Sequence, residues 1–315
     1  MSGIPLSDVI GRLRQQGARR VALQFPDGLR RRACDVARDL KDAGFEVIIS
    51  GDPCYGACDL AVETEEMADV LIHFGHAPVD DRPGVIYEYV PFTFDPAVLA
   101  EAVPLFTGTC VGLVTTIQHA HLVDEMAAFL ATRGIECRVG GPGLRTPMRG
   151  QILGCSFAAA RQTGAPEILY VGTGMFHPLG VQLATGVRVI ALDPFTGHAS
   201  VVDAERLLRK RFARIEKARD AETVGILVSL KSGQQRIDLA RRLESLSPRA
   251  FLITLREITP DALQNLGCTC YVNTACPRIA YDDQIRFPAP VLSPPEYEIA
   301  CGVRSWDDYL IDEMS

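Results

Sequence analysis

Short apolar runs alternate with helical patterns along this 315-residue chain, and this alternation limits the possible folds more than any other feature. In the first third, apolar runs at residues 18–25 and 45–50 flank residues 29–43, whose apolar side chains recur at helical spacing before Gly44. Strands that alternate with helices pair in parallel and carry the helices on the faces of the sheet. The sequence therefore predicts an α/β fold built on parallel sheets.

The same order of elements recurs twice more, which indicates internal repetition. The second round has apolar runs at 111–115 and 135–139, and the third has them at 224–230 and 250–255. The ends of the third strands also align, each with a polar or thiol residue before a proline: Gly75-His76-Ala77-Pro78, Phe176-His177-Pro178 and Ala275-Cys276-Pro277. We predict three similar parallel-sheet units that arose by triplication, at residues 1–104, 105–220 and 221–315, the last with a C-terminal tail.

The composition excludes several classes of protein. The formal net charge is −7 and no basic run or basic–aromatic stripe occurs, so no nucleic-acid partner is expected. No apolar run approaches the roughly 20 residues that span a bilayer, so we expect no membrane segment and a cytoplasmic location. Residues 203–219 are rich in Arg, Lys and Glu, and they predict a helix with a solvated surface between the second and third units.

Ten cysteines in a reducing compartment are not expected to form disulfides, so each is either a structural thiol or a metal ligand. Cys34 lies in a helical pattern and is interpreted as a core residue. Cys268 and Cys270 alternate on one predicted strand, so core packing on a common face is the interpretation we prefer for both.

Three other cysteines lie in loops or element boundaries beyond the ends of predicted strands, one in each unit: Cys58, Cys155 and Cys276. If the units pack around a common centre, three thiolates converge there and suit an iron–sulfur cluster that keeps one iron open. A structural zinc site needs four closed ligands, usually in close C-x₂-C pairs, and the sequence has no such pair. Spacing alone leaves open both a metal site and a chance arrangement.

Several motifs together resemble the 2-(3-amino-3-carboxypropyl)histidine synthase family, the archaeal diphthamide-synthesis radical enzymes. They occur in order along nearly the whole chain, at Gln24–Leu29, Gly51–Asp59, Gly150–Cys155, Lys231–Gln234 and Asn273–Ala280. The resemblance implies three repeated α/β domains around a central cluster site, in a homodimer. It also implies a [4Fe–4S] cluster held by one cysteine of each domain, which motif matching places at Cys58, Cys155 and Cys276. Cys54 is the rival of Cys58 in the first loop, and its role stays unassigned.

The resemblance implies an activity as well. Enzymes of this family are transferases that move a 3-amino-3-carboxypropyl group from S-adenosylmethionine to a histidine of translation elongation factor 2, the first step of diphthamide biosynthesis. An electron from the reduced cluster cleaves the bond between sulfur and Cγ, so an electron donor that the sequence does not identify is a further partner. The alternative is a non-catalytic partner subunit that binds a cluster or zinc.

The pocket of such an enzyme must hold the amino-carboxylate tail of S-adenosylmethionine. A loop that follows a predicted strand and opens a helix suits a carboxylate through its N–H groups and its lysine, and its residues are Lys231, Ser232, Gly233 and Gln234. Arg278 is a second candidate clamp through bidentate bonding, although it is also placed to pair with Asp282 or Asp283.

Two further residues are candidates for the same pocket. Asp27, in the first predicted turn between strand and helix, suits an amino or hydroxyl group, or else only caps the helix. His177 precedes a proline at a strand end, as His76 does, and either lines the site or is an ordinary loop residue.

Overall fold

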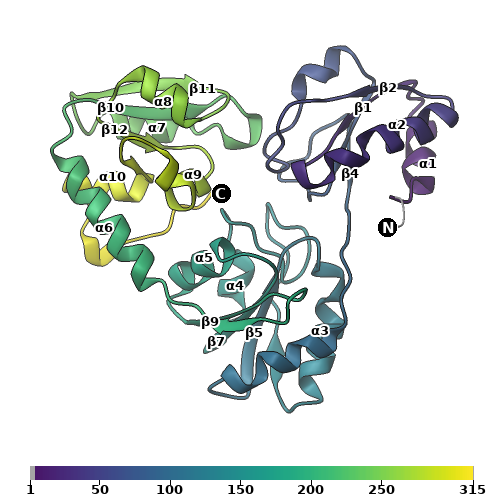
Figure 1. The fold of residues 1–315 in the computed structure, drawn as a ribbon, viewed down its shortest axis with the longest axis horizontal. Helices are drawn as coiled ribbons and strands as arrows, with labels where there is room; N and C mark the ends of the chain where they lie inside the picture. The colour runs from purple at the N-terminus through teal and green to yellow at the C-terminus, as the bar shows by residue number, and fades with distance from the viewer. Residues whose placement is uncertain (1–3, 315) are drawn as a thin grey trace.

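The computed structural model describes residues 4–314. Residues 1–3 and 315, which begin the first predicted unit and end the predicted tail, lie outside the described residues. The chain forms three separate sheets, and Figure 1 shows them as three blocks around a common centre. The predicted α/β fold with three similar parallel-sheet units is therefore confirmed.

The first sheet has the strand order β2-β1-β3-β4, with every pair parallel. Its strands are β1 (Arg20–Gln24), β2 (Glu46–Ile49), β3 (Val70–Phe74) and β4 (Val85–Glu88). Helices α1 (Ser7–Gln15) and α2 (Ala33–Asp42) and the 3₁₀ turns at Asp27–Arg32 and Val62–Glu66 complete this part of the chain. Every residue of β3 is buried, because β3 lies inside the sheet and is covered on both faces.

The second sheet has the order β6-β5-β7-β8-β9, and only its edge strand β9 is antiparallel. Its strands are β5 (Cys110–Thr115), β6 (Glu136–Arg138), β7 (Glu167–Val171), β8 (Arg188–Leu192) and β9 (Ala199–Val201). Its helices are α3 (Val123–Ala131), α4 (Ala158–Gln162) and α5 (Phe176–Thr185), with 3₁₀ turns at Pro96–Glu101, Val103–Leu105 and Ala120–Leu122.

The third sheet has the order β11-β10-β12-β13 and is parallel throughout. Its strands are β10 (Val224–Ser229), β11 (Ala250–Leu255), β12 (Cys270–Asn273) and β13 (Val291–Leu292). Its helices are α6 (Glu205–Arg219), α7 (Ile237–Glu244), α8 (Pro260–Leu266), α9 (Arg278–Tyr281) and α10 (Pro294–Ala300), with 3₁₀ turns at Ser232–Gln234, Asp283–Arg286 and Trp306–Asp308.

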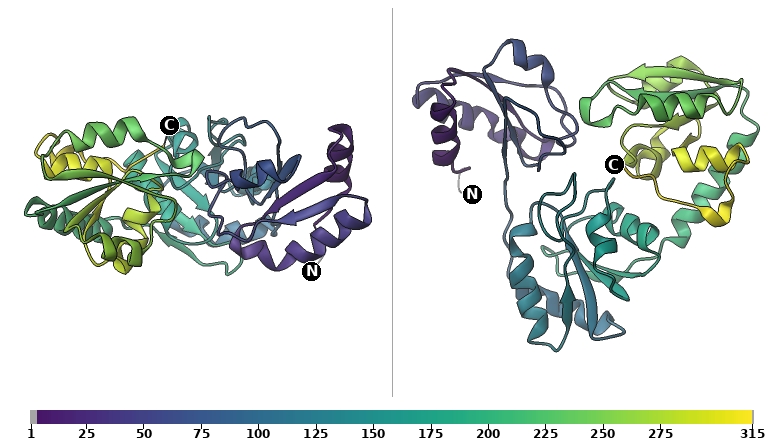
Figure 2. Two further views of the ribbon diagram at one scale, coloured as in Figure 1. Left: turned by 90° about the horizontal axis from the view of Figure 1, so that it is seen from above. Right: turned by 180° about the vertical axis from the view of Figure 1, so that it is seen from behind.

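The three sheets share one topology, because in each the first strand lies between the second and the third. The second strand lies on one side of the first strand, and the chain then crosses over to place the third strand on its other side. In sheets of this kind, ligands bind outside the carboxyl ends of the strands at such a switch point. In the view of Figure 1 and in the view from behind in Figure 2, the C-terminus lies between the three units. The fold thus gathers strand-end loops and the tail at one place.

One interpretation of a cysteine is wrong, and another is confirmed only in part. Cys34 is exposed, because α2 buries Ala33, Val36, Ala37 and Leu40, and at about 100° per residue Cys34 lies off that face. Cys268 and Cys270 both pack in the apolar core, as predicted, but not on a common face. Cys268 precedes β12, which begins at Cys270, and the two thiols contact different apolar clusters on the two sides of the third sheet.

The linking helix α6 differs from its prediction at one position. Most of its charged side chains are solvated, but Arg211 is buried and pairs with Glu296 of α10. None of the helices in residues 4–314 combines the length and the apolar character that crossing a membrane requires.

Candidate functional site

The structure brings the three predicted cysteines together. Cys58 follows β2, Cys155 follows β6 and Cys276 follows β12, so these cysteines are not at equivalent positions of the three repeats. Burial raises the pKa of Cys155 to about 11 and that of Cys276 to about 12. Both thiols also feel the charge of the Cys58 thiolate, and Cys276 feels that of Cys155, which raises each pKa further. The three thiols therefore form one electrostatically coupled group.

All three units interlock at Cys58. The Gly233 N–H donates a hydrogen bond to the Cys58 carbonyl at 3.2 Å, and the Gln234 Nε2 donates to the Cys58 Sγ at 3.3 Å. Arg145, from the second unit, donates from Nη2 to the Gly233 carbonyl at 3.1 Å. A loop of the third unit thus holds the loop that carries Cys58, and an arginine of the second unit holds that loop of the third unit in turn.

Arginine side chains favour the thiolate forms of these cysteines. Burial raises the pKa of Cys58, whereas the Gln234 hydrogen bond and the charge of Arg145 lower it. Arg145 and Arg236 act in the same direction on Cys155, and Arg278 acts so on Cys276. A site that binds a cation through three thiolates gains from these charges, since they limit the repulsion among the sulfurs.

The spacing of the thiols fits a cluster better than a single ion. Over residues 4–314, the group of three candidate side chains with all ligand atoms within 4.8 Å of one another is Cys54, His73 and His76. The thiols of Cys58, Cys155 and Cys276 are spread more widely than that, although they interact electrostatically. A cubane of four irons is larger than one ion and is bound by cysteine thiolates. Three thiolates around one centre therefore fit an iron–sulfur cluster.

The C-terminal tail closes one side of the site. The Met314 N–H donates to the Cys155 carbonyl at 2.8 Å. Arg236 pairs with Asp312 at 2.6 Å and also donates to the carbonyls of Thr274 and Ala275, which precede Cys276. Arg145 and Arg236 were missed in the sequence because no local pattern marks them, and only their contacts in the fold reveal this role.

A cavity of about 330 Å³ lies beside Cys276. Its lining includes four of the candidate residues, which are Lys231, Gln234, Cys276 and Arg278. Lys231 pairs with Asp59 at 2.8 Å and with Glu257 at 2.6 Å, and its ammonium lies 4.9 Å from the centre of the Tyr55 ring. Burial alone lowers the pKa of Lys231, but these two carboxylates outweigh burial and raise it. Lys231 is therefore a buried cation with two anionic partners.

The other candidates lie around this cavity or apart from it. Ser232 and Gly233 line a smaller cavity of about 170 Å³ together with Arg145. Arg278 pairs with Asp282 at 2.8 Å and also lines a third cavity, of about 500 Å³, which contains His177.

His177 and Asp27 have different surroundings. His177 lies in the first turn of α5 and stacks on Tyr170, and burial lowers its pKa to about 4, so its imidazole is neutral at pH 7. Asp27 begins a 3₁₀ turn and pairs with Arg30 at 3.0 Å. Asp27 is not among the residues that line the three cavities.

Gly233 provides a direct test of this interlocking. A Cβ at this position would lie 2.5 Å from the Cα of Cys58. Because this Cα is a backbone atom, a change of side-chain rotamer cannot relieve the clash. We expect Gly233→Ala to destabilise the fold by about 1–3 kcal/mol, the usual cost of overpacking, measured by urea unfolding. Gly28→Ala is the matched control, since no atom lies within 4 Å of a Cβ there. Equal stability of the two variants would contradict the close packing at Cys58.

Comparison with known proteins identifies the family of this chain. Residues 25–311 match the family model described as "Putative diphthamide synthesis protein". The chain is 38% identical to the 2-(3-amino-3-carboxypropyl)histidine synthase of Pyrococcus horikoshii, over 99% of this chain and 93% of that protein. It is 32% identical to the human 2-(3-amino-3-carboxypropyl)histidine synthase subunit 1, over 94% of this chain and 71% of that protein.

A solved structure agrees with these relatives. The crystal structure of Dph2 from Pyrococcus horikoshii with a 4Fe–4S cluster matches with a TM-score of 0.93 and 36% sequence identity, covering 99% of this chain and 94% of that one. The synthases named among the relatives are transferases, and this chain is accordingly an enzyme of that class. The chain belongs to the diphthamide synthesis family.

Proposed function

We propose that this enzyme transfers a 3-amino-3-carboxypropyl group from S-adenosylmethionine to a histidine of translation elongation factor 2, the first step of diphthamide biosynthesis. The observation that carries the proposal is the group of three partly buried thiols, one from each unit, that interact electrostatically. A homologous structure of 36% identity contains a 4Fe–4S cluster, which supports the same group here. In this proposal Cys58, Cys155 and Cys276 hold a [4Fe–4S] cluster.

When bound by Cys58, Cys155 and Cys276, a [4Fe–4S] cluster would supply the electron needed to cleave the bond between the sulfonium sulfur and Cγ of S-adenosylmethionine. The protein has to present that bond to the side of the cluster that no cysteine covers. The cavity beside Cys276 adjoins the cluster position, so it is the site where we place the co-substrate.

Charges of both signs line that cavity and match an amino-acid tail. Arg278, whose side chain is 58% exposed, binds the carboxylate once it leaves Asp282. Glu257, 40% exposed, lies at the same cavity and accepts hydrogen bonds from the ammonium group. Lys231 already has two carboxylate partners, so we assign it the task of holding Asp59 and Glu257 in place.

The remaining candidates have indirect tasks in this proposal. Gly233 and Gln234 hold Cys58 through hydrogen bonds, and Ser232 belongs to the same short loop. His177 lies across Arg278 from the main cavity, and its neutral ring adds no charge there. A role of Asp27 in binding S-adenosylmethionine stays a prediction.

The proposal also includes partners. The protein substrate is elongation factor 2 in the cytoplasm, the enzyme acts as a homodimer, and an external donor reduces the cluster. Nucleic acid has no part in the reaction. The alternative, a non-catalytic subunit, is less well supported because one chain carries all three thiols and matches 93% of a protein named as a synthase.

The test is an anaerobic assay with dithionite, S-adenosylmethionine and archaeal elongation factor 2, in which mass spectrometry measures the factor. We expect the factor to gain one 3-amino-3-carboxypropyl group, and methylthioadenosine to appear in equal amount. Omitting dithionite, or replacing the acceptor histidine of the factor, is expected to remove the mass shift. Methylthioadenosine without a modified factor would reject the proposed acceptor, and a colourless zinc protein without activity would reject the cluster.

A further inference from the structure

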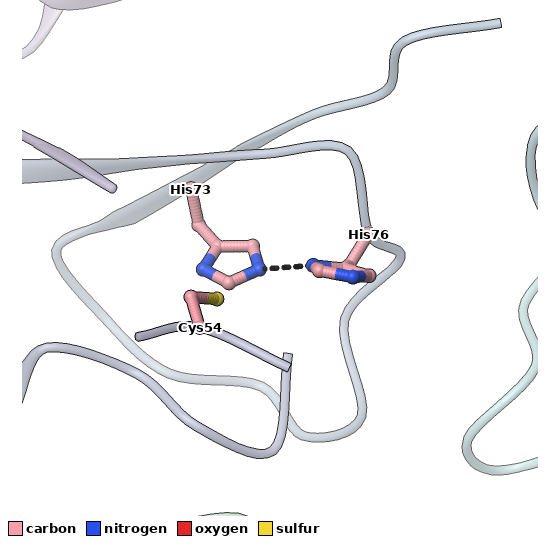
Figure 3. Close-up of side chains that lie close together, drawn as sticks. All are labelled: Cys54, His73 and His76. Atoms are coloured by element: carbon pink, nitrogen blue, oxygen red, sulfur yellow. Dashed lines mark hydrogen bonds between the residues drawn. The ribbon is translucent and has the colours of Figure 1, made fainter. Parts of the chain in front are cut away.

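Cys54, His73 and His76 form a second cluster of metal-binding side chains, and the proposed reaction uses none of them. Their ligand atoms all lie within 4.8 Å of one another, and Figure 3 shows the thiol and the two rings turned toward one another. Cys54 comes from the loop after β2, whereas the histidines come from the end of β3 and the turn that follows it. This group of three side chains therefore joins two segments of the first unit.

The backbone holds all three side chains in place. Cys54 is 2% exposed and His73 is fully buried in the centre of the sheet. Gly75 has a φ of 82°, a left-handed conformation that glycine adopts without strain, and it turns the chain between the two histidines. His76 can therefore face His73, and the two ring nitrogens Nε2 of His73 and Nδ1 of His76 lie 2.9 Å apart.

Gln24 determines which nitrogen of His73 is free. The Gln24 Nε2 donates to the Asp59 carbonyl at 2.7 Å, and its Oε1 accepts from the Ala61 N–H at 3.2 Å, so the amide orientation is fixed. The Nδ1 of His73 lies 2.8 Å from that same Oε1 and must donate its hydrogen to it. The lone pair of His73 is then on Nε2, which faces His76. Metal-binding histidines commonly have such a carbonyl partner on the second ring nitrogen.

We propose that Cys54 Sγ, His73 Nε2 and His76 Nδ1 bind one zinc ion. One sulfur and two imidazoles are ligands that zinc prefers, and Zn–N and Zn–S bonds measure about 2.0–2.1 and 2.3 Å. Tetrahedral angles at those bond lengths set the two nitrogens about 3.3 Å apart, so the 2.9 Å hydrogen bond opens by a few tenths of an ångström. On binding, Cys54 releases its proton, and the hydrogen of His76 moves from Nδ1 to Nε2.

Zinc at this position acts on the neighbouring iron–sulfur site. Cys54 precedes Cys58 by four residues in the same loop, and the two thiols interact electrostatically. A zinc ion fastens this loop to β3, so that Cys58 faces the other two thiols in a fixed position. With three protein ligands the ion takes a fourth from water, which can approach from the partly exposed His76.

Zinc content and zinc-edge X-ray absorption of the protein, purified anaerobically with its iron, test the proposal. We expect about one zinc per chain in a shell of one sulfur and two imidazole nitrogens. Cys54→Ser and His76→Gln are expected to lose the zinc, whereas Cys34→Ser, at an exposed cysteine, keeps it. Cys58→Ala is also expected to keep it, which separates this site from the three-cysteine site.

Three results would overturn the proposal. The first is a wild-type protein that takes up no zinc even when zinc is supplied during expression. The second is a shell of three sulfurs, which would place the zinc at Cys58, Cys155 and Cys276 instead. The third is adventitious zinc only, retained equally by Cys54→Ser and by wild type. Because the readout is zinc and not enzyme activity, failure of the proposed reaction leaves this test intact.

Discussion

Replacing Cys58, Cys155 or Cys276 singly by alanine is expected to abolish both the proposed iron–sulfur cluster and the proposed transfer activity. Each of the three thiols comes from a different unit. The loops that carry Cys155 and Cys276 contain no second cysteine that could replace the missing thiol. Two remaining thiolates hold a cubane too weakly to survive purification, since these clusters are bound by their cysteines. Iron is expected to fall from about four per chain to near zero, measured by iron and sulfide analysis and by visible absorption.

Controls for this experiment separate loss of ligands from loss of fold. Cys34→Ala removes an exposed thiol and is expected to keep full iron content. Cys137→Ala removes a partly buried thiol and is expected to keep the iron at some cost in packing. The first loop contains its own rival: if Cys54→Ala removes the iron and Cys58→Ala does not, the assignment of Cys58 is wrong.

Arg211→Met is expected to destabilise the third unit by about 3–5 kcal/mol, the usual cost of breaking a buried ion pair. Arg211 and Glu296 are 2% and 0% exposed and are joined by hydrogen bonds of 2.7 and 2.5 Å. Arg211 also donates to the carbonyls of Ala280 and Val291, so it ties α6 to three other segments. The variant leaves a carboxylate and two carbonyls buried without this partner. Trp306, the single tryptophan, packs against Phe212 of α6 and reports on this unit by fluorescence during urea unfolding.

The same helix offers a matched control. Arg209 pairs with Glu205 at 2.6 Å, but the two side chains are 79% and 73% exposed, so Arg209→Met is expected to change stability by less than about 0.5 kcal/mol. The double variant Arg211→Met with Glu296→Leu is expected to recover most of the lost stability, because it leaves no unpaired buried charge. A single variant as stable as wild type would show that the pair contributes nothing.

Short-range pattern was enough to predict the fold class. Strands such as β3, β7 and β10 are mostly apolar and are buried throughout, as expected for strands covered on both faces. The three repeats were visible because each unit carries the same order of local signals, and the family motifs lie within single loops. Cys58, Cys155 and Cys276 were candidates for the same reason, since each belongs to a short motif at a strand end.

The tertiary structure alone decided which charges and thiols have partners. From the sequence, Lys231 was a candidate to bind a substrate carboxylate. In the fold it pairs with Asp59, which lies 172 residues earlier in the chain. The sequence predicts that Arg211 belongs to a solvated helix. In the fold it is buried and pairs with Glu296, which lies 85 residues further along the chain. Within its own loop the Cys54 thiol donates to the Gly56 carbonyl at 3.7 Å. The pairing of β1 with β2 and β3 is what brings it to His73 and His76. Local sequence determines which elements form, because backbone preference and apolar spacing act over a few residues. Burial and charge depend on neighbours that the chain meets only after folding, and in this protein they decide the surroundings of the site.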